Sequence, residues 1–172
     1  MKHILRTDCG EATRAVAATL ARLARPGDLL LLAGELGAGK TAFAQGFGLG
    51  LGVTEPITSP TFVLARDYDD GRLPLHHLDV YRLDKLNEVF DIGLPEVLDD
   101  GGVTLIEWGD AIMPSLPADY LEVRLTFGDG DDERVIVVRP VGPGWATRSG
   151  ALERALAEWV SPVTGPAEAA GC

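Results

Sequence analysis

Two stretches of the chain are apolar almost without interruption. Residues 28–33 and 103–106 have the length of a strand that is buried on both faces, as in a parallel sheet. Residues 120–127 instead alternate in type, and a turn rich in glycine and aspartate at 128–132 leads into the apolar stretch 134–138. The pattern therefore predicts two buried central strands, followed by an antiparallel hairpin.

Apolar residues recur at helical spacing between 11 and 24, which predicts a helix before the first buried strand. A second helix is predicted at 41–47, and we expect it to fray over 48–52 because glycine is costly inside a helix. Shorter segments predict strands at 2–5, 62–65 and 73–78, and helices at 87–90, 94–98 and 151–160. These elements predict one domain over residues 1–160 and a poorly ordered tail, 161–172.

The segment between the first buried strand and the second helix is rich in glycine. Residues 34–41 read Gly-Glu-Leu-Gly-Ala-Gly-Lys-Thr and satisfy G-x-x-x-x-G-K-S/T, a loop that wraps backbone N–H groups around nucleotide phosphates. Lys40 is placed to reach the β- and γ-phosphates, and the Thr41 hydroxyl to ligate Mg²⁺. The residues expected to contact the nucleotide here are Glu35, Leu36, Gly37, Ala38, Gly39, Lys40, Thr41 and Ala42.

A buried strand that enters such a loop and a helix that leaves it predict a fold class. We expect a three-layer α/β fold like that of the P-loop NTPases, with a mostly parallel central sheet flanked by helices and an antiparallel hairpin portion. The domain over 1–160 is therefore predicted to be a single P-loop ATPase domain.

Hydrolysis also needs an acidic residue that organises Mg²⁺ and the attacking water. Glu107 follows the apolar run 103–106, and Asp79 follows the strand-like segment 75–78. Open α/β sheets bind their ligands at such strand ends. We assign Glu107 to the metal, directly or through a water, and Asp79 to a bound water or the outer shell of the metal. Together with Lys40 they form the predicted catalytic set. The alternative for each carboxylate is a helix cap or a surface ion pair.

The roles of other residues near these motifs are less specific. The hydroxyls of Ser59 and Thr61 can contact the γ-phosphate or the metal, as in nucleotide switches, or belong to an ordinary turn. His76 and His77 point to opposite faces of a strand, so they cannot share a metal, and we expect structural roles for both. Trp108 can pack beside the nucleotide, against a partner or in the core.

The charge of the chain restricts its partners. A net charge of −11 and a pI of about 4.6 give a surface that repels phosphodiester backbones, so any contact with nucleic acid is expected to run through a partner protein. No apolar run approaches the length that spans a membrane, and the N-terminus lacks the apolar core of a signal peptide. We therefore expect a cytoplasmic protein without a membrane partner.

Taken in order, the motifs resemble those of the TsaE family, formerly YjeE. They are Gly-Glu-Leu-Gly-Ala-Gly-Lys-Thr at 34–41, Ser-Pro-Thr-Phe at 59–62, His-Leu-Asp-Val-Tyr-Arg at 77–82, Asp-Ile-Gly at 91–93 and Ile-Glu-Trp at 106–108. The resemblance implies a small P-loop ATPase that binds ATP and Mg²⁺ and hydrolyses ATP slowly alone. It also implies docking on a TsaD–TsaB heterodimer, which transfers a threonylcarbamoyl group to the tRNA adenosine beside the anticodon.

The same resemblance implies a role for each matched position. Lys40 would contact phosphate, Thr41 and Glu107 would hold Mg²⁺, and Asp79 would support hydrolysis. Trp108 would lie at the nucleotide site.

Two further positions of the family pattern bear on the phosphates. Residues 59–61 would form a switch-like loop. The family often has a second threonine where this chain has Ala42, so a hydroxyl near the α-phosphate is missing.

Three other functions use a similar loop. A small-molecule or nucleotide kinase needs an acceptor pocket and commonly an arginine-rich lid, but no arginine occurs between Glu107 and Arg124. A GTPase-like switch is expected to carry Asn-Lys-x-Asp, which the chain lacks. A nucleotide-gated binding module would hold the nucleotide as a structural staple without turnover.

Overall fold

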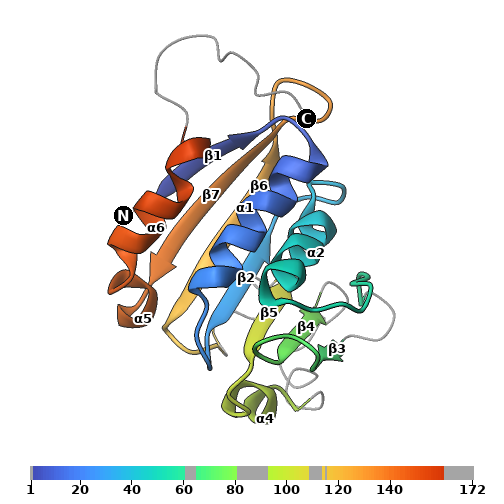
Figure 1. Ribbon diagram of the computed structural model, residues 1–172, viewed down its shortest axis with the longest axis vertical. Helices are drawn as coiled ribbons and strands as arrows, with labels where there is room; N and C mark the ends of the chain where they lie inside the picture. Colours follow the sequence, from blue (N-terminus) through green and yellow to red (C-terminus); the bar gives the residue numbers. More distant parts are fainter. Residues whose placement is uncertain (1, 61–64, 81–92, 109–113, 115, 161–172) are drawn as a thin grey trace.

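The computed structural model describes residues 2–60, 65–80, 93–108, 114 and 116–160. Over these residues a seven-stranded sheet has the strand order β1-β7-β6-β2-β5-β4-β3 (Figure 1). The strands are β1 His3–Thr7, β2 Leu29–Ala33, β3 Ala65–Tyr68, β4 Leu75–Asp79, β5 Val103–Glu107, β6 Tyr120–Phe127 and β7 Arg134–Val141. The helices are α1 Gly10–Leu23, α2 Lys40–Leu51, α4 Leu94–Asp99, α5 Pro143–Ala146 and α6 Ser149–Leu156, with a 3₁₀ turn, η3 Ala157–Trp159.

The four central strands are parallel, and antiparallel strands lie at both ends of the sheet. β6, β2, β5 and β4 pair in parallel, whereas β1 and β7 extend the β6 side and β3 pairs with β4. All residues of β2 and β5 are buried, as the apolar runs predict. All residues of β4 are buried as well, although its sequence Leu-His-His-Leu-Asp is no apolar run. β6 and β7 form the predicted hairpin.

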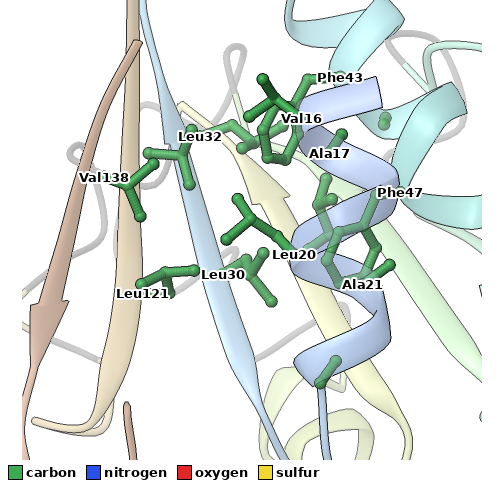
Figure 2. Close-up of a cluster of buried hydrophobic side chains, with 14 of the residues drawn as sticks. Val16, Ala17, Leu20, Ala21, Leu30, Leu32, Phe43, Phe47, Leu121 and Val138 are labelled. Atoms are coloured by element: carbon green, nitrogen blue, oxygen red, sulfur yellow. The ribbon is translucent and has the colours of Figure 1, made fainter. Parts of the chain in front are cut away.

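The two faces of the sheet carry separate apolar clusters. On one face, Leu30 and Leu32 pack with residues of α1 and α2, including Phe43 and Phe47 (Figure 2). On the other, alternate β2 residues cluster with Leu94 of α4. Helices therefore cover both faces of a mixed sheet, and the predicted three-layer P-loop fold class is confirmed.

The predicted fraying of the second helix is wrong. α2 continues through its glycines to Leu51 and ends at Gly52, whose φ of 86° is left-handed. A Cβ at Gly46 would lie 2.2 Å from the Arg14 carbonyl oxygen, and one at Gly50 would lie 2.5 Å from that of Ala18. The glycines thus let α2 pack against α1 at very short range, and this packing outweighs their low helix propensity.

The remaining differences lie at β3, which begins at Ala65 where the predicted strand 62–65 ends, and towards the end of the chain. The helix predicted at 151–160 spans Ser149–Leu156, and the short helix α5 has no counterpart among the predicted elements. The predictions for 62–64, 87–90 and the tail 161–172 fall outside the described residues. Within the described part, no helix combines the length and apolarity that crossing a bilayer requires.

Candidate nucleotide-binding site

The parallel strands end at one edge of the sheet, where the glycine-rich loop also lies. β2 and β6 run upward in Figure 1 and reach this edge together, next to the β6–β7 turn. The register pairs Glu107 with Leu32 on one side and with Asp79 on the other. Their side chains are buried, with Glu107 3% and Asp79 4% exposed. Both predicted carboxylates therefore lie near the start of the loop.

The loop backbone adopts conformations that require glycine. Gly34, Gly37 and Gly39 have φ values of 149°, 80° and 104°. A Cβ at Gly34 would also lie only 2.4 Å from the carbonyl oxygen of Leu125. Gly39 is the N-cap of α2 and makes no side-chain cap hydrogen bond, because glycine has no side chain to accept from the N–H groups of the first helical turn. This is the geometry that accepts phosphate oxygens at a helix N-terminus.

Within the loop, the residues differ in exposure. Ala38 and Lys40 are buried, Thr41 and Ala42 are half-buried, and Glu35, Leu36 and Gly37 are exposed. Leu36 reaches 87% exposure, so its contact with a nucleotide would be through its backbone.

Lys40 lies over the loop and against an aromatic ring. Its Nζ donates hydrogen bonds to the carbonyl oxygens of Gly34 at 2.8 Å and Glu35 at 2.9 Å. The same Nζ is 4.0 Å from the centre of the Trp108 ring, within the range of a cation–π interaction. The ammonium group is therefore held where the loop phosphates are expected.

Trp108 has an unusual backbone conformation. Its φ of 62° is the one positive value of a non-glycine residue in the described chain. Such a conformation is strained and concentrates at functional sites. Its N–H donates to the Leu32 carbonyl at 2.8 Å, and its ring packs against the apolar cluster that includes Leu94. The core interpretation of Trp108 therefore holds, and the ring also contacts Lys40.

Glu107 has a partner that the sequence analysis missed. Nε2 of His77 lies 2.9 Å from Oε1 of Glu107, and both side chains are buried. His76 contacts different residues, with Nδ1 2.7 Å from Asp67 and Nε2 2.9 Å from Asp100. The two histidines therefore point apart as predicted. The one signal for the Glu107 contact was the spacing of His77 and Asp79, which places both on one strand face.

The loop before Ser59 is attached to α2. The Gln45 amide donates to the Ile57 carbonyl at 3.2 Å, and a Cβ at Gly48 would overlap the Ile57 side chain. Ser59 is half-buried at the end of this segment, whereas Thr61 lies outside the described residues. Ile57 therefore fixes this segment to the helix that follows the glycine-rich loop.

The β6–β7 hairpin borders the loop on its other side. The Phe127 ring lies 3.8 Å from the position of a Cβ at Gly37, and Arg134 donates to the Gly37 carbonyl at 3.5 Å. The Arg134 guanidinium lies 4.8 Å from the centre of the Phe127 ring. The sequence predicted the hairpin, but its position beside the loop depends on the β2–β6 pairing.

The donor set fits magnesium bound together with a nucleotide. In the described parts of the chain, no group of three or more His, Cys, Asp and Glu side chains has the geometry of a metal cage. Mg²⁺ commonly takes one or two carboxylates and completes its shell with phosphate oxygens and water. The Glu107 carboxylate and the Thr41 hydroxyl would be oxygen ligands of that kind.

The family model described as "Threonylcarbamoyl adenosine biosynthesis protein TsaE" matches residues 7–136. The chain belongs to the TsaE family. It is 47% identical over 137 residues to the tRNA threonylcarbamoyladenosine biosynthesis protein TsaE of Bacillus subtilis, a match that covers 80% of this chain and 85% of the relative. The TsaE protein of Streptomyces coelicolor is 47% identical over 135 residues, covering 74% and 90%.

A solved structure agrees with this membership of the TsaE family. The crystal structure of Bacillus subtilis YdiB superposes with a TM-score of 0.79 at 40% identity and covers 90% of this chain and 95% of that chain. The resemblance predicted from the motifs is therefore confirmed at the level of family and fold.

Proposed function

We propose that the chain binds Mg²⁺–ATP at residues 34–41 and hydrolyses it slowly to ADP and phosphate. The observation that carries the proposal is Lys40, whose ammonium group donates to two carbonyls of the glycine-rich loop. The buried carboxylates Asp79 and Glu107 end the neighbouring strands. On phosphate binding, Lys40 exchanges its carbonyl partners for negatively charged oxygens, which are stronger acceptors. Loop N–H groups and the N-terminus of α2 hold the remaining oxygens.

Magnesium supplies charge neutralisation at the β- and γ-phosphates. Thr41 and Glu107 would hold it, and Asp79, one strand further along, would orient the attacking water. Ser59 and Thr61 would respond to the γ-phosphate.

In the cell, we propose that this ATPase supports tRNA threonylcarbamoyladenosine modification. The support is membership of the TsaE family and the names of the relatives. We infer that the chain docks on TsaD-like and TsaB-like proteins in the cytoplasm and reaches tRNA through them. The net charge of −11 favours such an indirect route.

Calorimetry and a turnover assay test the nucleotide part. We expect heat of binding with ATP and Mg²⁺, its loss in Lys40→Ala, and retained binding without turnover in Glu107→Gln. ATP should outcompete GTP for the site. The γ-phosphate should be released as inorganic phosphate and should not be transferred to small-molecule acceptors. Identical behaviour of wild type and Lys40→Ala would overturn the proposal. Capture by TsaD and TsaB homologues, with and without ATP, tests the partner part.

A further inference from the structure

His77 is a buried histidine whose contact the proposed roles leave unexplained. It is the middle residue of β4 and is 0% exposed. Its Nε2 lies 2.9 Å from Oε1 of Glu107. Because a carboxylate oxygen can only accept, Nε2 carries the proton and donates the hydrogen bond. This assigns the ring to the Nε2–H tautomer.

The other ring nitrogen speaks against a purely structural role. Nδ1 of His77 is buried, and within the described chain it has no hydrogen-bond partner. A buried polar atom without a partner destabilises the fold and is uncommon. An apolar side chain at this position would avoid that cost. An apolar residue could not, however, donate a hydrogen bond to Glu107, and this is what the histidine provides.

The register places His77 beside the predicted reacting groups. On β4 and β5, His77 lies opposite Leu105, and Asp79 lies opposite Glu107. His77 and Glu107 are therefore diagonal neighbours on one face of the sheet, the face that also carries Asp79. Leu105 belongs to the apolar cluster shared with α2, so this is the face towards the helix that follows the loop.

We propose that His77 is a positioning residue for Glu107. The Nε2–H holds Oε1 and so restricts the carboxylate to one orientation, which leaves Oε2 as the oxygen for magnesium. This inference rests on the proposed ATPase function, in which Glu107 is a metal ligand. Hydrogen bonds to ligating carboxylates orient them, and their loss typically costs about 10–100-fold in metal affinity or activity.

Substitutions at His77 and its neighbour test the proposal. His77→Leu removes the donor, whereas His77→Gln retains an N–H near the position of Nε2. His76→Gln is the matched control, because His76 contacts Asp67 and Asp100 instead. We expect His77→Leu to lower kcat about 10–100-fold and to raise the Mg²⁺ concentration that gives half-maximal rate. His77→Gln should recover most of this loss, and His76→Gln should stay near wild type.

Binding gives a readout that does not depend on turnover. Calorimetry should show unchanged ATP affinity without Mg²⁺ in His77→Leu, but a smaller gain in affinity when Mg²⁺ is added. Nitrogen-15 NMR of the ring should report the Nε2–H tautomer in the wild-type chain. Should His77→Leu fail to fold, His77→Asn serves instead, since its shorter amide does not reach Glu107.

The outcomes separate this inference from the function on which it rests. Wild-type kcat and magnesium dependence in His77→Leu would overturn the inference alone. Equal losses in His77→Leu and His77→Gln, or an Nδ1–H ring, would do the same, since either indicates a role other than donation to Glu107. Absence of ATP binding by the wild-type chain would overturn the proposed function together with the inference.

Discussion

At the scale of single residues, Lys40 shows how much of the site is arranged in advance. Its Nζ bonds to two loop carbonyls and lies 4.0 Å from the centre of the Trp108 ring. Negatively charged phosphate oxygens are stronger acceptors than carbonyls, so nucleotide binding is expected to redirect the ammonium group. The Lys40 ammonium group would then move relative to the Trp108 indole, and the electrostatic environment of the ring would change.

This exchange predicts a fluorescence change on nucleotide binding. ATP with Mg²⁺ should alter the emission of the wild-type chain, because the charge next to the Trp108 indole changes. In Trp108→Phe the change should disappear while calorimetry still detects binding. Trp159→Phe, at a distant tryptophan in η3, is the control and should keep the change. An unaltered response in Trp108→Phe would rule out this account.

A second residue-scale prediction concerns pH. Burial lowers the pKa of His3 below its ordinary value of 6.5, although Glu153 acts in the opposite direction. Below pH 6.5 the unfolded chain therefore takes up a proton that the folded chain resists, and stability falls as the pH falls towards the folded pKa. Thermal melts between pH 7.5 and 5.5 should show a smaller loss in His3→Phe than in wild type. Parallel curves would contradict this assignment.

The sequence was sufficient to predict those site residues that belong to a motif or directly follow a strand. Lys40 belongs to the loop pattern, and Asp79 and Glu107 follow recognisable strand segments, so their common edge was predictable. His77 was assigned only a structural role, because its contact with Glu107 depends on the relative register of two strands. The left-handed backbone of Trp108 leaves no trace in residue type, since glycine is the usual choice there.

At the scale of elements, the close contact between α1 and α2 depends on glycines, which have no side chain. Gly46 and Gly50 lie one helical turn apart on α2, against the backbone of Arg14 and Ala18. Helix propensity alone predicted an early end, whereas tertiary packing decides the length of α2. The central strands β2 and β5 were predicted more closely because burial on both faces leaves an almost uninterrupted apolar run. α5 has four residues, too few for a periodic pattern.

Adding one methyl group to this contact should destabilise the fold. A Cβ at Gly46 would lie 2.2 Å from a backbone oxygen, so Gly46→Ala forces the helices apart and should cost about 1–3 kcal/mol. Gly150→Ala in α6 is the control, since a Cβ there meets nothing closer than 3.6 Å. Its higher helix propensity should raise stability by up to about 1 kcal/mol. Urea unfolding measures both, and equal stability gains would refute the packing argument.

At the scale of the whole molecule, residues 137–160, which lie beyond the family match, belong to the same body. The family model ends at residue 136, yet β7 continues to Val141 and α6 packs beside α1 and β1 (Figure 1). Arg148, ahead of α6, makes paired hydrogen bonds of 2.6 Å to both carboxylate oxygens of Asp28 and lies over the Trp145 ring. This joins the C-terminal segment to the start of β2, at the opposite end of that strand from the loop.

Because the Arg148–Asp28 pair is buried and far from the loop, it should govern stability without governing binding. Arg148→Met leaves the Asp28 carboxylate without its cation and should destabilise the fold by about 3–5 kcal/mol. In Arg148→Met combined with Asp28→Asn, the cost should be smaller than in Arg148→Met alone, since the uncompensated charge is gone. Urea unfolding gives these differences, and calorimetry at low temperature should find wild-type ATP affinity for the folded fraction. Weakened ATP binding in a fully folded Arg148→Met chain would instead couple the C-terminal segment to the nucleotide site through β2.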